Sequence, residues 1–253
     1  MTDHSADSGA LGPSPGQRLP RGRHGLDPEQ VVASQRARIF SAMTSVTAVK
    51  GYATTTVADV LAVAGVSRET FYGQFRSKLD CFEQAFEDAN TLLFALITQE
   101  ADRRASSPPP SLATDAPPSR KTGSKRSGSA VSAAGGARAG AASAADTFDW
   151  VLGAYLHVLA SYPDLARMCL VEVYAAGPPL ARRRAEVQER FARQLERLFD
   201  ARDAESRFAC HALVASISSM VTARLAAGDT TPLEDLREPF AALVRQALRE
   251  QSA

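Results

Sequence analysis

The pattern of apolar and polar positions predicts a chain built from helices. Apolar residues recur three and four positions apart along most of the sequence, the spacing that places them on one face of an α-helix. In the first predicted helix, residues 28–50, this stripe holds Ile39, Met43, Val46 and Val49. The further predicted helices cover residues 56–64, 68–75, 77–104, 148–162, 165–174, 180–199, 208–225 and a last segment from Leu236 to Ala247. We therefore expect an all-α fold.

The turn between the second and third predicted helices has strong local signals. Thr56 supplies a hydroxyl cap and Asp59 stands three residues later, which predicts a capping box with Asp in place of Glu. Gly65 follows the last apolar residue, where a helix often ends in a left-handed backbone conformation. Ser67 is a good cap for the helix that follows. Residues 56–75 are thus predicted to form two short helices joined by a tight turn.

The third predicted helix should keep its polar side chains outside. Phe71 and Phe75 lie four positions apart and are expected to anchor one face of the helix to the domain. The residues left facing outward or toward DNA are Ser67, Arg68, Thr70, Tyr72 and Gln74. Two short helices with such a polar second helix have the layout of a helix-turn-helix DNA reader.

Further residues at the right spacing extend this motif from about Arg36 to Phe86. The matching segments are Lys50–Tyr52, Thr55–Val57, Ala64–Ser67, Thr70–Tyr72 and Phe75–Phe82. On these residues the segment resembles the N-terminal domain of the tetracycline-repressor (TetR) family of transcription regulators. The resemblance implies an N-terminal three-helix DNA-binding domain followed by a larger helical domain for ligand binding and dimerisation. It does not set the base preference, because Gly73 and Gln74 stand where the family often has a variable residue and a histidine.

The start of the third helix is predicted to reach base edges in the major groove. Arg68 either pairs there with a guanine or stays solvated. Thr56, Tyr72 and Lys78 are predicted to contact phosphates, which give affinity and register rather than sequence information. The complete predicted DNA-binding set is Arg21, Arg23, Thr55, Thr56, Ser67, Arg68, Thr70, Tyr72, Gln74 and Lys78.

The sequence divides into five predicted segments. Residues 1–27 form a disordered basic arm, in which Arg21 and Arg23 either reach a minor groove or belong to a merely disordered tail. The other segments are the helix-turn-helix domain at 28–80, with its motif at about 56–75, a connecting helix at 81–104, an insert at 105–145 and an effector-binding and dimerisation domain at 146–253. The insert is rich in Pro, Ser, Ala and Gly and is predicted to be disordered, because it cannot bury enough apolar surface. It is either a neutral linker or a source of weak attraction to phosphates.

The predicted helix at 208–225 is apolar nearly all round, so it must be buried on nearly all sides. A stripe of small residues along it permits close approach of another helix. Paired across a two-fold axis with the last helix, it would form a four-helix bundle, the dimer interface that the TetR resemblance implies. The alternative is a core within one chain. The predicted interface residues are Ala212, Ser216, Ser219, Ala223, Phe240, Leu243 and Val244.

Aromatic residues with a few polar tips in the second domain suit a mostly apolar small molecule. The predicted effector-pocket residues are Phe94, Trp150, Tyr155, His157, Tyr162, Met168, Tyr174 and His211. Each of them is alternatively an ordinary core residue. Arg182–Arg184 could seek an anion, but a solvated helix face is the favoured interpretation of that run.

Composition narrows the class of protein. The net charge of +1 gives no global basic field, and the three cysteines form no CxxC pair, which suits a reducing cytoplasm. No apolar run has the roughly 18 residues of a membrane span, and no h-region of a signal peptide is found. We find no nucleophile motif, phosphate loop or metal spacing, so we expect no enzyme, no cofactor and no metal.

These observations predict a cytoplasmic DNA-binding regulator of transcription. The predicted form is a repressor that binds a palindromic operator in double-stranded DNA as a homodimer and is released by a small, mostly apolar effector. The alternative is a helical binding module with only non-specific DNA binding, or an activator.

Overall fold

The computed structural model describes residues 27–106, 135–229 and 231–250, and all regular structure in these residues is helical. The expected all-α fold is therefore confirmed. The chain divides after Ala85 into two compact units. Arg21 and Arg23, and most of the predicted disordered insert, lie outside the described residues.

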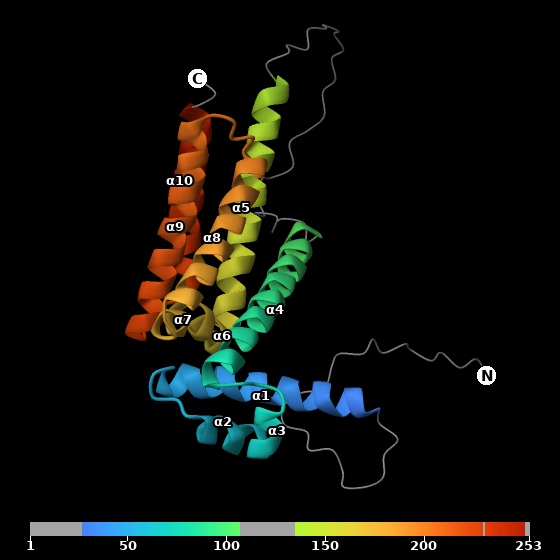
Figure 1. Ribbon diagram of the computed structural model, residues 1–253. Helices are drawn as coiled ribbons and strands as arrows, with labels where there is room; N and C mark the ends of the chain where they lie inside the picture. Colours follow the sequence, from blue (N-terminus) through green and yellow to red (C-terminus); the bar gives the residue numbers. More distant parts are fainter. Residues whose placement is uncertain (1–26, 107–134, 230, 251–253) are drawn as a thin grey trace, which may run out of the picture. The chain divides into compact units, whose positions relative to one another are not determined.

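The N-terminal unit consists of α1 (Pro28–Lys50), α2 (Val57–Ala64), α3 (Arg68–Tyr72) and the start of α4 (Lys78–Ser106). Asp27 caps α1 by accepting a hydrogen bond from the Glu29 amide, and Pro28 occupies the first turn. In Figure 1, α2 and α3 pack together on α1. The largest side chains of the core are fully buried and come from all four helices and from the turn after α3: Ile39, Met43, Val60, Phe71, Phe75 and Phe82.

Two details of this unit differ from the prediction. Val49 is 83% exposed, so the last buried apolar residue of α1 is Val46, followed by the buried Thr47. The regular part of α3 ends at Tyr72 instead of Phe75, because Gly73 follows it as the cap. Phe75 is buried all the same, since its amide still bonds to the Phe71 carbonyl over one more turn, at 2.8 Å.

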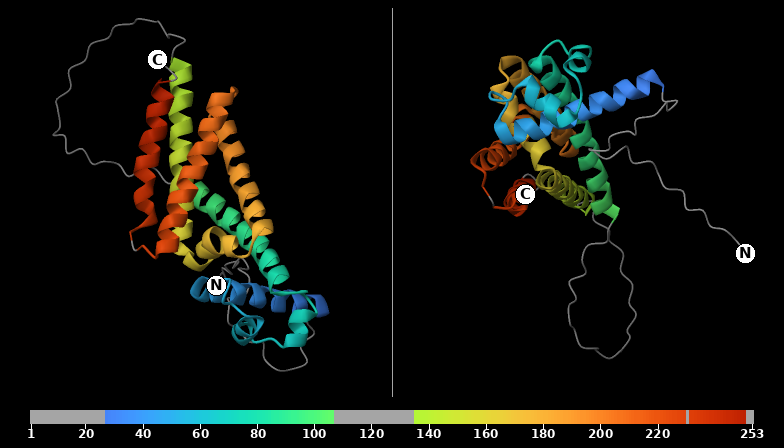
Figure 2. Two further views of the ribbon diagram at one scale, coloured as in Figure 1. Left: turned by 60° about the vertical axis from the view of Figure 1, so that its left-hand side comes forward. Right: turned by 90° about the horizontal axis from the view of Figure 1, so that it is seen from below.

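In its described residues, the C-terminal unit comprises the rest of α4 and six further α-helices. They are α5 (Gly135–Ser161), α6 (Pro163–Arg167), α7 (Val173–Ala175), α8 (Pro178–Leu198), α9 (Ala204–Ala227) and α10 (Arg237–Glu250), with a π-helical turn at Met168–Glu172 and a 3-10 turn at Leu233–Leu236. Helix α10 packs on α5, and α9 packs on α8 (Figure 2). A bidentate ion pair joins the first of these pairs, with Arg237 nitrogens at 2.8 and 2.6 Å from the Asp149 carboxylate.

Two helix predictions in this unit are wrong in their bounds. Helix α5 starts at Gly135, inside the segment 105–145 that was expected to be disordered. The end of that segment is rich in Ala, the best helix former, so a packed helix extends readily through it. The single helix expected at 165–174 is instead α6, the π-helical turn and α7.

Candidate DNA-binding surface and effector cavity

The start of α2 is fixed by the predicted capping box. The Asp59 amide donates to the Thr56 hydroxyl at 3.2 Å, and the Asp59 carboxylate accepts from the Thr56 amide at 2.9 Å. The same carboxylate pairs with Lys50 at 2.7 Å. The hydrogen bond from Lys50, together with those from Thr56, lowers the pKa of Asp59 to about 2. This helix start is therefore tied to the end of α1.

The turn and α3 also follow the sequence signals. Gly65 ends α2 with φ 63°, the left-handed conformation that glycine adopts without strain. Ser67 caps α3 by accepting from the Thr70 amide at 3.0 Å, and the Ser67 and Thr70 hydroxyls lie 2.9 Å apart. Phe71 is fully buried, whereas Tyr72 is 49% exposed and Arg68 is exposed. The helix thus presents a polar face of the kind that reads DNA.

Three predicted DNA contacts are placed differently. Thr55 is 2% exposed and donates its hydroxyl to the Gly51 carbonyl at 2.8 Å, so it holds the turn before α2 and is not on the surface. The Lys78 ammonium donates to the Tyr52 and Thr55 carbonyls at 2.9 Å each and lies 4.1 Å from the centre of the Tyr52 ring.

Burial lowers the pKa of Lys78 from its usual value. Its two hydrogen bonds to backbone carbonyls connect the start of α4 to the segment between α1 and α2. This structural role does not depend on a phosphate contact. Gln74 is half-buried and its amide nitrogen lies 3.4 Å from the Gln35 side chain. The other described residues of the predicted set are exposed or half-buried and stay predicted DNA contacts: Thr56, Ser67, Arg68, Thr70 and Tyr72.

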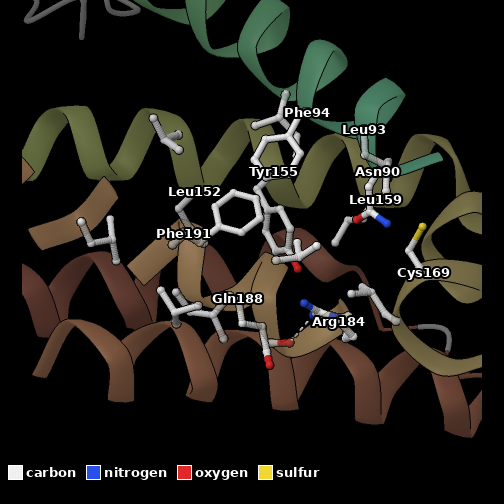
Figure 3. Close-up of a pocket in the computed structure, with 18 of the residues that line it drawn as sticks. Asn90, Leu93, Phe94, Leu152, Tyr155, Leu159, Cys169, Arg184, Gln188 and Phe191 are labelled. Carbon is white, nitrogen blue, oxygen red and sulfur yellow. Dashed lines mark hydrogen bonds between the residues drawn. The ribbon is translucent and has the colours of Figure 1, made fainter. Parts of the chain in front are cut away.

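The C-terminal unit contains a partly open, mostly apolar cavity of about 100 Å³. Phe94 stacks on Phe191 with ring centres 4.7 Å apart, and Tyr155 meets Phe191 edge-on at 6.2 Å. Figure 3 shows these rings together inside the cavity, with Arg184 and Gln188 reaching it from the same unit. The other lining residues are Asn90, Leu93, Ile97, Phe148, Val151, Leu152, Leu159, Cys169, Leu170, Val187, Leu195, Val214, Ile217 and Ser218.

Only two of the predicted effector residues, Phe94 and Tyr155, line this cavity. Met168 is buried without lining it, and its neighbour Cys169 in the π-helical turn takes that place. The remaining five predictions are wrong for this cavity. Trp150, Tyr162 and Tyr174 are exposed, His157 lies 3.8 Å from Glu234, and His211 pairs with Glu189 and Glu196. Aromatic composition alone could not separate the inner from the outer helix faces.

Arg184 is the charged residue among the lining residues that the sequence analysis missed. It is 4% exposed, and its Nη2 donates to the Ser218 hydroxyl at 2.6 Å, while its Nε is buried without a hydrogen-bond partner. The expected solvated face is therefore wrong for this member of the arginine run. Its spacing gave a signal, because Arg184 is three residues before Val187 and seven before Phe191, on the apolar side of α8.

A second, wider hollow of about 570 Å³ shares Asn90, Phe94 and Val187 with the cavity. Its lining is more polar, with charges of both signs between α4 and α8. Arg183 pairs with Glu87, and the Arg190 guanidinium lies 5.5 Å from the centre of the Phe94 ring. The apolar cavity is thus adjacent to a charged surface.

The predicted dimer residues separate into two groups. Ala212, Ser216, Ser219 and Ala223 are exposed on α9, and Leu243 on α10 is 56% exposed. Phe240 and Val244 are 7% and 6% exposed because they pack inside their own chain. The prediction that they lie in the dimer interface is therefore wrong. Phe208 and Met220 were missed, although they are 73% and 46% exposed on α9.

Helix α9 is also the one described helix that is long and apolar enough to cross a membrane by length and composition. Such a single helix is weak evidence for a membrane span. Within the described residues, no group of three His, Cys, Asp or Glu side chains could hold a metal ion. Burial raises the pKa of the Cys81 and Cys169 thiols to about 12, so both stay protonated at neutral pH.

Comparison with known proteins agrees with this geometry. Residues 39–85 match the family model of bacterial regulatory proteins, tetR family. No curated protein matches the chain. The chain is a DNA-binding helix-turn-helix regulator of transcription. The match covers the segment that the sequence resemblance assigned to a TetR-type DNA-binding domain.

Solved structures share the fold over most of both chains. The fatty acid degradation regulator FadR from Bacillus halodurans is 17% identical, with a TM-score of 0.56 over 83% of this chain and 97% of that one. FadR from Bacillus subtilis, solved in complex with stearoyl-CoA, is 15% identical, with a TM-score of 0.57 over 82% and 96%. A TetR-like regulator from Rhodococcus sp. RHA1 is 16% identical, with a TM-score of 0.56 over 88% and 96%. At these identities the similarity establishes the common fold.

Proposed function

We propose that this protein is a cytoplasmic repressor that binds a palindromic operator as a homodimer and leaves it when a small, mostly apolar effector binds. The observation that carries the proposal is the capped helix α3, which buries Phe71 and leaves Arg68 and Tyr72 exposed. Arginine at the start of such a helix suits a bidentate pair with a guanine in the major groove. We expect the exposed Thr56 and Tyr72 side chains to contact DNA phosphates.

The exposed face of α9 supports the homodimer. Its small residues allow another helix to approach closely, while Phe208 and Met220 are large apolar side chains left in contact with water. Covering them with the same face of a second copy is the simplest closed arrangement, because a two-fold interface is self-complementary. A two-fold dimer would present two reader helices to half-sites about one DNA turn apart.

The cavity supports an apolar effector. Its volume of about 100 Å³ is below the ~300–1,000 Å³ of sites for drug-sized ligands, so an effector must widen it on binding. Helix α4 contributes Lys78 to the N-terminal unit and Phe94 to the cavity. It is therefore the helix proposed to couple effector binding to the release of DNA. An effector that favours a state unsuited to the operator would release the DNA.

In-vitro selection of DNA from a random pool, with full-length protein at fixed moderate salt, tests the proposal. A palindromic motif that Arg68→Ala relaxes at one position in each half-site is the expected result. Salt-sensitive binding without an enriched motif would instead indicate the alternative, a helical module with only non-specific DNA binding. The sign of regulation is then read from a reporter gene placed behind the selected site.

A further inference from the structure

The cavity of the C-terminal unit contains a cation that the described part of the chain does not neutralise. Arg184 is 4% exposed, and its hydrogen-bond partner is the neutral Ser218 hydroxyl, at 2.6 Å from Nη2. The buried Nε has no partner. None of the described carboxylates lies within 4 Å of its guanidinium to form an ion pair.

Three acidic residues of the same unit have other partners. Glu172, 6% exposed, lies 3.4 Å from Arg167, and Glu87 pairs with Arg183. Glu196 pairs with His211 at 3.0 Å. A buried charge without a counter-ion is strongly unfavourable, so such a residue points to a partner that comes from outside the chain.

We propose that the effector is an aliphatic carboxylate and that Arg184 binds its carboxylate group inside the cavity. This inference rests on the proposed function and names the chemical class of its effector. The planar guanidinium suits two parallel hydrogen bonds to a carboxylate, and its free Nε is one of the donors for them. The aliphatic chain then lies against Phe94, Tyr155 and Phe191, whose rings are already in contact.

A carboxylate fits this site better than a phosphate or a thioester. A phosphate group carries about −1.5 to −2 charges at neutral pH, and Arg184 offers one positive charge in a mostly apolar lining. The carbonyl of an acyl thioester carries no charge, so it would leave the buried cation without a counter-ion. The polar lining residues Asn90, Gln188 and Ser218 can complete the hydrogen bonds of one carboxylate.

Calorimetric titration of the full-length protein tests the proposal with three matched ten-carbon probes. They are decanoate, decan-1-ol and decanoyl-CoA, and hexanoate and hexadecanoate extend the series to other lengths. The variants are Arg184→Met, which keeps the bulk and removes the charge, Arg184→Lys, which restores a charge, and the control Arg182→Met, an exposed position of α8. We expect the best-fitting carboxylate to bind about 10- to 100-fold tighter than its alcohol, the range for hydrogen bonds to a charged group.

In Arg184→Met this preference for the carboxylate should disappear, while the alcohol binds at least as well as to the unaltered protein. Arg184→Lys should recover part of the preference, and Arg182→Met should keep all of it. Equal affinity for carboxylate and alcohol, a preference that survives in Arg184→Met, or no binding of any carboxylate would overturn the proposal. So would tighter binding of decanoyl-CoA that is independent of Arg184.

The DNA-binding experiment separates this inference from the proposed function. Selection of a palindromic operator together with equal binding of decanoate and decan-1-ol would leave the repressor proposal standing and reject the carboxylate. Carboxylate binding through Arg184 without a selected DNA motif would support the carboxylate site and reject the repressor proposal.

Discussion

Arg184, the proposed ligand-binding side chain, should lower the stability of the ligand-free protein. Its guanidinium is surrounded mostly by apolar residues, and Ser218 satisfies only one of its nitrogens. Replacing a buried ionic group by an apolar one of similar size often stabilises a protein. After replacement of Arg184, the Ser218 hydroxyl would still have a hydrogen-bond partner, because serine in a helix can donate to the carbonyl four residues before it.

Arg184→Met should therefore raise the free energy of unfolding of the ligand-free protein. The expected increase is at most about 1–4 kcal/mol, the range known for replacing buried ionic groups by apolar ones. The measurement is the unfolding midpoint by circular dichroism without added ligand. Arg182→Met is the control, and its exposed position should change stability by less than about 0.5 kcal/mol. A lower midpoint for Arg184→Met would show that the arginine is a structural residue.

Lys78 gives a second residue-scale prediction. Because its ammonium serves the Tyr52 and Thr55 carbonyls, Lys78→Met should cost about 1–3 kcal/mol of stability through two unsatisfied acceptors. It should weaken binding to all DNA sequences alike and leave the slope of log K against log salt nearly unchanged. A slope smaller by about one unit would instead identify Lys78 as a phosphate contact.

The residue-scale predictions from sequence succeeded where the partner is local. Thr56 and Ser67 cap helices three residues away, and a spacing rule finds such pairs. Lys78 and Thr55 donate to backbone carbonyls of the segment between α1 and α2, and the type of residue does not reveal these partners. Arg184 was missed because three consecutive arginines were treated as one face, although a helix turns about 100° per residue.

At the scale of elements, helix α2 depends on a carboxylate. Asp59 has a folded-state pKa of about 2, below the value near 3.9 of an unfolded chain, because the Lys50 and Thr56 hydrogen bonds favour its charged form. Its contribution to stability is therefore complete above about pH 4 and is lost as the pH falls through about 2. The join between α1 and α2 should weaken over this interval.

Asp59→Asn tests this effect. The unfolding midpoint of the unaltered protein should fall more steeply between pH 4 and pH 2 than that of Asp59→Asn, which has already lost the pair with Lys50. Circular dichroism at several pH values gives the two curves. Asp88→Asn, at an exposed carboxylate of α4, is the matched control and should follow the unaltered protein. Parallel curves for Asp59→Asn and the unaltered protein would contradict the assignment.

The elements themselves were predicted best where apolar periodicity is strong. The bounds of α1, α2 and α8 lie close to the expected ones. Periodicity says nothing of a π-helical turn, so the division at Met168–Glu172 was not foreseen. Cys169 and Leu170 of this turn line the cavity. This is one reason why the effector-pocket residues predicted from aromatic composition were mostly wrong.

At the scale of the whole molecule, the exposed face of α9 is the proposed dimer interface. The sequence predicted its small-residue stripe, but Phe240 and Val244 were wrongly added because periodicity does not say whether a buried face meets its own chain or a second copy. The exposed residues Phe208 and Met220 complete the stripe, and all of them lie on one helix.

Ala212→Arg should disrupt the proposed homodimer. A two-fold interface would bury both introduced arginines without counter-ions, which should raise the dimer dissociation constant at least about 100-fold. Sedimentation equilibrium over a range of concentrations measures this constant. Operator binding should weaken with it even though Arg68 is intact, because a palindrome is read by two coupled helices.

The control for this experiment is Ala185→Arg, the same change at an exposed alanine of α8. It should leave both the dimer and operator binding unaltered. If Ala212→Arg dimerises as well as the control, the two copies meet on another face. If the unaltered protein is a monomer at every concentration, the palindrome must be read by copies that pair only on DNA, and α9 then needs another cover for Phe208.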